Sequence, residues 1–185
     1  MKMRINSISG ILLCLVCLTV AAQDIQDDFA DGLQGWGNWK AKAAIVQFQH
    51  DAQSGRSAPG SLTLILGPKN PEQSSACFTK HLAVQPGKTY TALVYVRTEG
   101  LAEPASLSIG LQGQDAKKSF LGTQVLSGKV ENSQIAPGEW KRIVYTVRVP
   151  ETGRWENAAF LLCTLAVKGS TEGQAWFDDF MFFEN

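Results

Sequence analysis

"TYTALVYVRT", residues 89–98, decides the fold of this chain, because its side chains alternate between two kinds of position. Successive side chains of a β-strand point to opposite faces. One face then holds the apolar candidates for a core, which are Tyr90, Ala92, Val94 and Val96. The other face holds Thr91, Leu93, Tyr95 and Arg97. The stretch is therefore predicted to be a strand that covers a core with one face only.

Runs of the same period continue in both directions from this strand. They are "SLTLIL" (61–66) and "CFTKHLAV" (77–84) before it, and "SLSIGLQG" (106–113), "EWKRIVYTVRVP" (139–150), "AAFLLCTLAV" (158–167) and "AWFDDFMFF" (175–183) after it. Gly and Pro turns separate the runs, and no long window has helical spacing. About eight or nine strands of this kind predict an all-β fold, a two-sheet antiparallel β-sandwich of the jelly-roll type.

Length and composition agree with one globular domain. The chain has 185 residues, of which 44% are hydrophobic and 18% charged, which is enough for a sizeable core. The formal net charge is zero and no basic run occurs, so nothing indicates a nucleic-acid partner. No linker or internal repeat interrupts the pattern, and a single domain is predicted over residues 23–185.

Residues 1–22 have the organisation of a secretory signal peptide. Lys2 and Arg4 precede an apolar stretch over residues 11–20, and Ala21-Ala22 provides a small-residue cleavage site. The apolar stretch is shorter than a membrane-spanning helix requires. We therefore expect a cleaved signal peptide, a secreted or periplasmic location and no membrane span after cleavage.

Signal cleavage would leave two cysteines, Cys77 and Cys163. An exported protein enters an oxidising compartment, which favours a disulfide between them. Both residues lie in strand-like runs, and a free cysteine also behaves as a small buried hydrophobe. The spacing leaves both a Cys77–Cys163 disulfide and two separate thiols open.

Four segments together resemble a known family. They are "DDFADGLQGW" (27–36), "AVQPGKTYTALVYVRTEG" (83–100), "APGEWKRIVYTVRVP" (136–150) and "QAWFDDFMFF" (174–183), in that order. The chain looks like the carbohydrate-binding modules of families 4 and 9, which belong to the galactose-binding-like jelly rolls. The resemblance implies a secreted, non-catalytic protein that binds a poly- or oligosaccharide.

The same resemblance implies a structural calcium ion where the N-terminal segment meets the last strand. Strand alternation places Asp178 on the face of Trp176, Phe180 and Phe182, where a carboxylate needs a partner. Ala30 stands where such modules often have Glu, and Asp28 is the expected substitute ligand. The metal ligands predicted for Ca²⁺ are therefore Asp178 and Asp28. The alternative is that Asp178 accepts backbone N–H hydrogen bonds and binds no metal.

Sugar-binding candidates come from two sources. An exposed indole can stack on a pyranose ring, and Trp39 and Trp155 are the candidates. Trp36 and Trp140 are expected in the core, and Trp176 is expected to be buried. The outward faces of two predicted strands add Tyr95, Arg97 and Gln112, which could supply a ring and hydrogen bonds. An ordinary solvated sheet face is the alternative for these three residues.

Catalytic motifs are missing from the sequence. There are two histidines, His50 and His81, and neither H-E-x-x-H nor G-x-S-x-G occurs. Asp178 and Asp179 are adjacent in a strand and would face apart, whereas glycoside hydrolases need two facing carboxyl groups. We expect a binding protein that is not an enzyme. The alternatives are an interaction or adhesion module on the same fold, and a small jelly-roll hydrolase or lyase.

Overall fold

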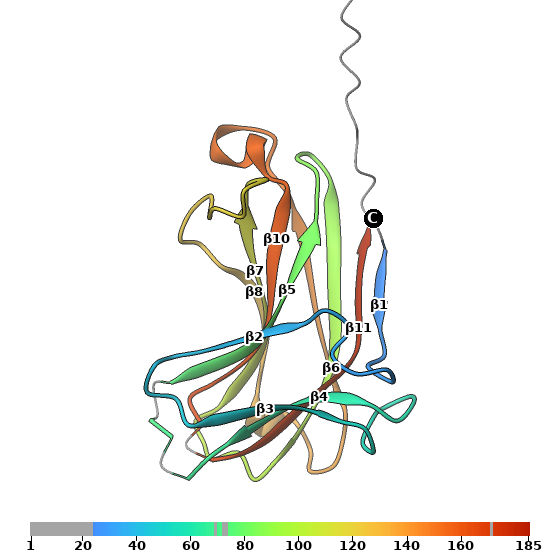
Figure 1. Ribbon diagram of the computed structural model, residues 1–185, viewed down its shortest axis with the longest axis vertical. Coiled ribbons are helices and arrows are strands. Elements are labelled where there is room, and N and C mark those ends of the chain that lie inside the picture. The colour runs from blue at the N-terminus through green and yellow to red at the C-terminus, as the bar shows by residue number, and fades with distance from the viewer. Residues whose placement is uncertain (1–23, 69, 72–73, 171) are drawn as a thin grey trace, which may run out of the picture.

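The computed structural model describes residues 24–68, 70–71, 74–170 and 172–185, and two antiparallel β-sheets pack face to face in it (Figure 1). The six-stranded sheet has the order β3-β4-β11-β6-β9, with β1 paired to β11 beside this path. Its strands are β1 (Ile25–Asp27), β3 (Val46–Asp51), β4 (Ser61–Leu66), β6 (Thr89–Glu99), β9 (Lys141–Arg148) and β11 (Gly173–Glu184). The predicted signal peptide falls outside the described residues.

The five-stranded sheet has the order β2-β5-β10-β7-β8. Its strands are β2 (Gly37–Lys40), β5 (Ser75–Ala83), β7 (Ser106–Gln114), β8 (Leu126–Glu131) and β10 (Phe160–Lys168). The helical segments of the described chain are two short 3₁₀ helices, η1 (Asn132–Gln134) and η2 (Gly153–Asn157). The predicted all-β sandwich is confirmed. No described helix is long and apolar enough to cross a membrane.

The core lies between the inner faces of the two sheets. In β6, the four positions predicted to face inward are fully buried, namely Tyr90, Ala92, Val94 and Val96. In β7, the inward positions Leu107, Ile109 and Leu111 are also fully buried. Each sheet therefore contributes one apolar face, and the opposite face of each strand is left for other roles.

A β-bulge interrupts the last strand. Asp178 pairs with Tyr95 of β6, whereas the next pair in register is Met181 with Leu93, so β11 has one extra residue here. Asp179 is in the left-handed region, with φ 48°. The bulge turns Phe180 toward the core, and the prediction that Asp178 shares a face with Phe180 and Phe182 is therefore wrong.

The two cysteines are free and buried. Cys77 is paired in register with Ala166 of β10, and Cys163 with Lys80 of β5. Cys163 belongs to the core, whereas Cys77 lines a cleft on the outer face of the same sheet. The predicted Cys77–Cys163 disulfide is wrong, because the two side chains leave the sheet on opposite faces.

The N-terminal strand connects the two sheets. β1 pairs with the second half of β11 in the six-stranded sheet. At its end, the carboxylate of Asp27 accepts a hydrogen bond from Trp36 Nε1 at 2.8 Å and from Lys80 Nζ of β5 at 2.6 Å. The Asp27–Lys80 ion pair is largely buried, so it fastens the N-terminal segment to the five-stranded sheet.

Candidate functional site

A cleft of ≈ 650 Å³ lies on the outer face of the five-stranded sheet. Side chains from β2, β5, β7 and β10 form its floor and one side, and the β7–β8 connection forms the other side. Its lining consists of Asn38, Trp39, Ser75, Cys77, Thr79, His81, Gln112, Phe120, Val125, Leu162, Thr164 and Ala166. The lining residues of β5, β7 and β10 are the outward half of the period-two pattern whose inward half builds the core.

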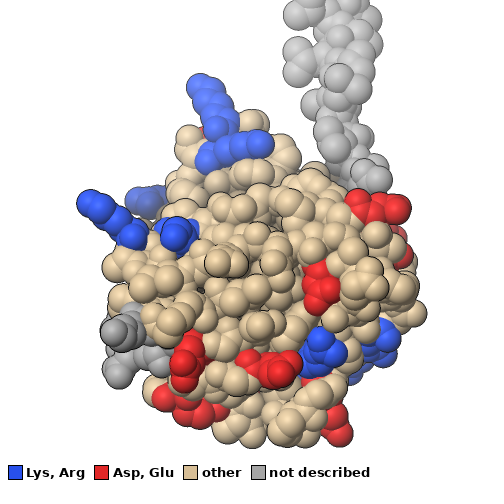
Figure 2. Space-filling model, turned by 60° about the horizontal axis from the view of Figure 1, so that its bottom comes forward, with Lys and Arg blue, Asp and Glu red and all other residues tan. Residues whose placement is uncertain are grey.

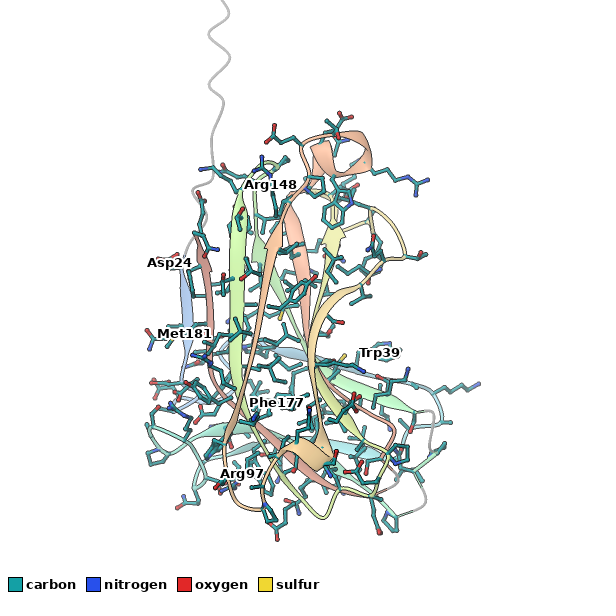
Figure 3. All side chains as sticks on the ribbon, turned by 180° about the vertical axis from the view of Figure 1, so that it is seen from behind. Asp24, Trp39, Arg97, Arg148, Phe177 and Met181 are labelled. Carbon is teal, nitrogen blue, oxygen red and sulfur yellow. The ribbon has the colours of Figure 1, made fainter. Side chains whose placement is uncertain are left out.

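Two exposed aromatic rings flank the cleft. Trp39 is on β2, the strand at one edge of the sheet, and Phe120 is in the connection that follows β7 near the other edge. Each side chain is 54% exposed, and Figure 3 shows Trp39 on the outside of the sheet, far from the interior Phe177. Exposed aromatic rings gathered around one concave site mark it as a candidate binding site.

The floor of the cleft follows from the strand register. Leu162 of β10 lies between His81 of β5 and Gln112 of β7. Two residues further along, Thr164 lies between Thr79 and Gly110. The floor therefore alternates between apolar and hydroxyl-bearing positions along β10.

Gly110 makes room for the floor of the cleft. A Cβ atom added at Gly110 would overlap the hydroxyl of Thr164 and lie 3.0 Å from Val125 Cγ1. The missing side chain therefore lets Val125, from the β7–β8 connection, settle on the sheet beside Thr164. A larger residue at Gly110 would push both groups away.

The β7–β8 connection is held in one shape by its own hydrogen bonds. Asp115 Oδ1 accepts from Lys117 N at 2.8 Å and from Ser119 N at 2.9 Å. Gln112 Nε2 donates to the carbonyl of Gly122 at 3.0 Å and ties the loop to β7. These bonds fix the segment that carries Phe120.

The cleft has no charged residue in its lining. The Nδ1 of His81 is 2.9 Å from Gln114 Oε1, so the other ring nitrogen remains for a ligand. Burial raises the pKa of the Cys77 thiol to about 11, and this residue is therefore a neutral part of the floor at neutral pH. The chemistry available is ring stacking together with uncharged hydrogen bonds.

Two of the five predicted sugar-binding residues, Trp39 and Gln112, lie together in this cleft. Trp155 is elsewhere, on η2, where its ring packs over Gly113 and covers the end of the core. Sequence reasoning missed Phe120, Val125 and Leu162. An aromatic residue inside the polar loop "DAKKSF" was the signal that could have identified Phe120.

Tyr95 and Arg97 are on the outer face of the six-stranded sheet, and Figure 3 shows Arg97 well separated from Trp39. The guanidinium of Arg56 lies over the Tyr95 ring, 3.7 Å from its centroid. Arg97 lies 4.4 Å from the ring centroid of Trp176 and 5.2 Å from that of Trp140. Trp176 is buried as predicted, but Trp140 is half-buried on this face and is not part of the core.

The predicted metal ligand Asp178 is fully buried on the outer face of β11. Its carboxylate accepts hydrogen bonds from the backbone N–H groups of Arg56, at 2.5 Å, and Asp179, at 2.7 Å. Burial, together with the negative charges of Asp179 and Asp28, raises the pKa of Asp178 to about 6, although the two backbone hydrogen bonds lower it. Asp179 has its own counter-ion, because Arg56 Nη1 lies 2.8 Å from it.

The surroundings of Asp178 supply oxygen donors but no cluster of charged ligands. Among the described residues, no group of three or more His, Cys, Asp or Glu side chains is placed to hold a metal ion. The buried hydroxyls of Ser61 and Thr63 have no hydrogen-bond partner, and both belong to the outer face of β4, the neighbour of β11. Hydroxyl, carbonyl and carboxylate oxygens are the donors that Ca²⁺ prefers, so the donor chemistry fits this ion.

Comparison with known proteins adds two findings. A family model described as "Carbohydrate binding domain", CBM_4_9, matches residues 23–166. No curated protein matches the chain.

Several solved structures share the fold. The CBM22-2 xylan-binding domain of Xyn10C from Paenibacillus barcinonensis is 12% identical, with a TM-score of 0.64, and the match covers 87% of this chain and 99% of that one. TmCBM61, solved with β-1,4-galactotriose, is 15% identical with a TM-score of 0.54, over 87% and 97% of the two chains. The enzymatically active domain of tailspike protein 4 from bacteriophage CBA120 is 11% identical with a TM-score of 0.62, and the match covers 87% of this chain but only 21% of that one. At these identities the likeness shows the fold.

Proposed function

The chain belongs to the CBM_4_9 family of carbohydrate binding domains, and from this we propose that it binds a poly- or oligosaccharide in the cleft on the five-stranded sheet. The observation that carries the proposal is the pair of exposed rings, Trp39 and Phe120, on opposite sides of an uncharged floor. A pyranose ring has an apolar C–H face that packs on an aromatic ring, while its hydroxyls need uncharged donors and acceptors.

The floor offers such donors and acceptors. Thr79, His81 and Gln112 line the cleft with hydrogen-bonding groups. Gln112 keeps its Oε1 for a ligand, because its amide nitrogen is the atom bound to Gly122. The cleft therefore combines stacking surfaces with directional polar groups, as saccharide sites require.

We propose that the protein acts without catalysis. Hydrolysis of a glycosidic bond requires two carboxyl groups on either side of the bond, and no Asp or Glu lines the cleft. A secreted or periplasmic location completes the proposal and rests on the signal-like residues 1–22. The face in Figure 2 has scattered acidic and basic side chains with broad uncharged areas between them, which suits a neutral partner better than a nucleic acid.

Binding measurements with matched variants test this proposal. Isothermal titration of the purified protein against a panel of soluble polysaccharides should give binding to at least one of them. Trp39→Ala should weaken that binding at least tenfold, about 1.4 kcal/mol, because it removes a stacking surface. Trp140→Ala, which alters a half-buried ring on the other sheet, should leave affinity unchanged. Equal losses in the two variants would contradict the assignment of the cleft.

We also propose that Asp178, with Asp28, holds a structural calcium ion that ties the last strand to the N-terminal segment. The support is the raised pKa of a fully buried carboxylate and the unpartnered hydroxyl of Ser61 on the neighbouring strand. A divalent cation would offset the repulsion among the carboxylates of Asp178, Asp179 and Asp28. The ion would be structural, because this region is on the sheet opposite the cleft.

A further inference from the structure

The cleft is chemically uneven across the sheet. The side toward β2 and β5 has the hydrogen-bonding residues Asn38, Ser75, Thr79 and His81 beside Trp39. Toward the β7–β8 connection the lining is mostly apolar, with Phe120 and Val125 from the connection and Leu162 and Ala166 from the central strand β10, and Gln112 of β7 is a polar exception. A ligand that spans the cleft therefore meets polar groups on one side and hydrocarbon on the other.

The apolar side is unsuited to a free sugar hydroxyl. A hydroxyl pressed against Phe120 or Val125 would lose its hydrogen bonds to water and gain none from these two side chains. Gln112 offers only its Oε1, as an acceptor beside Leu162, because its amide nitrogen already donates to the carbonyl of Gly122. The part of the ligand that meets this side must present hydrocarbon.

One polar group remains within the apolar side. Thr164 lies on β10 between Leu162 and Ala166, and its hydroxyl donates to the carbonyl of Gly110 across 3.5 Å, a long contact. Such a hydroxyl can turn to another acceptor at little cost. Because Val125 Cγ1 and this hydroxyl both approach the same point above Gly110, a methyl surface and a hydrogen-bond donor stand side by side.

We propose that the cleft prefers a neutral saccharide that carries acetyl groups. The acetyl methyl packs against Phe120, Val125 and Leu162, and the acetyl carbonyl accepts a hydrogen bond from Thr164. No Lys, Arg, Asp or Glu lines the cleft, so it offers no permanently charged side chain for an acidic sugar. This inference rests on the proposed function, since it names the substrate class of the same cleft.

Matched pairs of ligands test the proposal and separate an acetyl ester from an acetamide. The first pair is an O-acetylated xylo-oligosaccharide and the same material after mild alkaline deacetylation. The second pair is tetra-N-acetylchitotetraose and cellotetraose, which differ by an acetamido group in place of the 2-hydroxyl on each of the four sugar residues. Titration calorimetry on the purified protein should show at least a tenfold tighter Kd for the acetylated member of one pair. That pair identifies the linkage.

Two nearly isosteric variants locate the effect. Val125→Thr puts a hydroxyl on the apolar side and should reduce the acetyl preference at least threefold. Val144→Thr is the control, since Val144 is 43% exposed, close to the 50% of Val125, but belongs to β9 of the other sheet. Its preference should equal that of the unchanged protein.

The possible failures are distinguishable. Equal Kd values within both pairs, or tighter binding of the deacetylated members, would overturn the acetyl preference and leave the proposed function standing. An unchanged preference in Val125→Thr would overturn its placement on the apolar side. A folded protein that binds none of the four ligands and no polysaccharide of the panel would overturn both proposals.

Discussion

The pKa of the Asp178 carboxyl group is set by the surroundings of this residue in the folded protein. It is fully buried, yet its hydrogen bonds come from two backbone N–H groups and the nearby cation, Arg56, pairs with Asp179. Burial, together with the neighbouring negative charges, raises the pKa of Asp178 to about 6. At neutral pH the residue is therefore charged at a cost to the folded state.

The pH dependence of stability follows from this shift. The folded-state pKa is above the unfolded value of 3.8, so the folded protein binds the proton more tightly. The stabilisation is complete below pH 3.8 and is lost as the pH rises through about 6. In EDTA, the unfolding free energy of the protein relative to Asp178→Asn should fall by about 3 kcal/mol between pH 3.5 and 7. Urea titrations at several pH values measure this difference.

The effect of calcium on the melting temperature tests whether Asp178 is a metal ligand. Millimolar CaCl₂ at pH 7 should raise the Tm above its value in EDTA, because a ligand that binds only the folded state stabilises that state. Asp178→Asn should lose this calcium response, whereas Asp179→Asn should be less stable, without its pair to Arg56, but should keep the response. The same Tm in EDTA and in calcium would mean that the two backbone N–H groups alone satisfy Asp178.

At the scale of elements, the β7–β8 connection decides the shape of the cleft. It follows a strand with Gly110 in its middle, and it brings Phe120 and Val125 over the sheet. The loop has its own hydrogen bonds, centred on the Asp115 carboxylate. Its conformation is therefore set before any ligand arrives, which lowers the entropic cost of binding.

Removing the hydrogen bonds of the Asp115 carboxylate should weaken ligand binding, although Asp115 does not line the cleft. Asp115→Ala deletes the acceptor for Lys117 N and Ser119 N and lets the loop sample other conformations. We expect about a fivefold loss of glycan affinity, equivalent to about 1 kcal/mol. Asp115→Asn keeps a side-chain oxygen at the same place and should bind almost as well as the unchanged protein. Equal affinities for both variants and the unchanged protein would show that the loop bonds do not shape the site.

At the scale of the whole molecule, the two sheets share more than an apolar core. Asp27 ends the strand that pairs with β11, whereas Lys80 belongs to β5 of the opposite sheet. Their ion pair is reinforced by Trp36 Nε1 and by the carbonyl of Gln34, which accepts a hydrogen bond from Lys80 at 2.9 Å. A buried pair of this kind is strongly destabilising when one partner is removed.

Two lysine substitutions compare a buried pair with an exposed one. Lys80→Met keeps most of the side-chain volume but leaves the Asp27 carboxylate buried without its cation, and should cost about 3 kcal/mol of unfolding free energy. Lys88→Met breaks the surface pair with Glu184 and should cost less than about 1 kcal/mol. Denaturant unfolding followed by tryptophan fluorescence measures both. A similar small cost for both would show that the Asp27–Lys80 pair does not fasten the sheets.

The alternation of residues by itself determined the fold class and most of the core. Val94 and Val96 face inward because a strand has two faces, and Leu107 and Ile109 do so for the same reason. These assignments need only the neighbours along the chain. Trp39 and Gln112 were within reach as outward-facing candidates, since exposure of a strand residue follows from the same alternation.

Only the tertiary structure decided which outward-facing side chains lie together in one cleft. Trp39 and Phe120 come from opposite edges of one sheet, and strand order is not written in any local pattern. The same limit applies to the two cysteines, because only the tertiary structure shows that β5 and β10 are neighbours. It also applies to the bulge at Asp179, where one extra residue reverses the alternation before Phe180. Period and composition are properties of a segment, whereas a cleft, a disulfide and the environment of a buried carboxylate depend on which segments become neighbours.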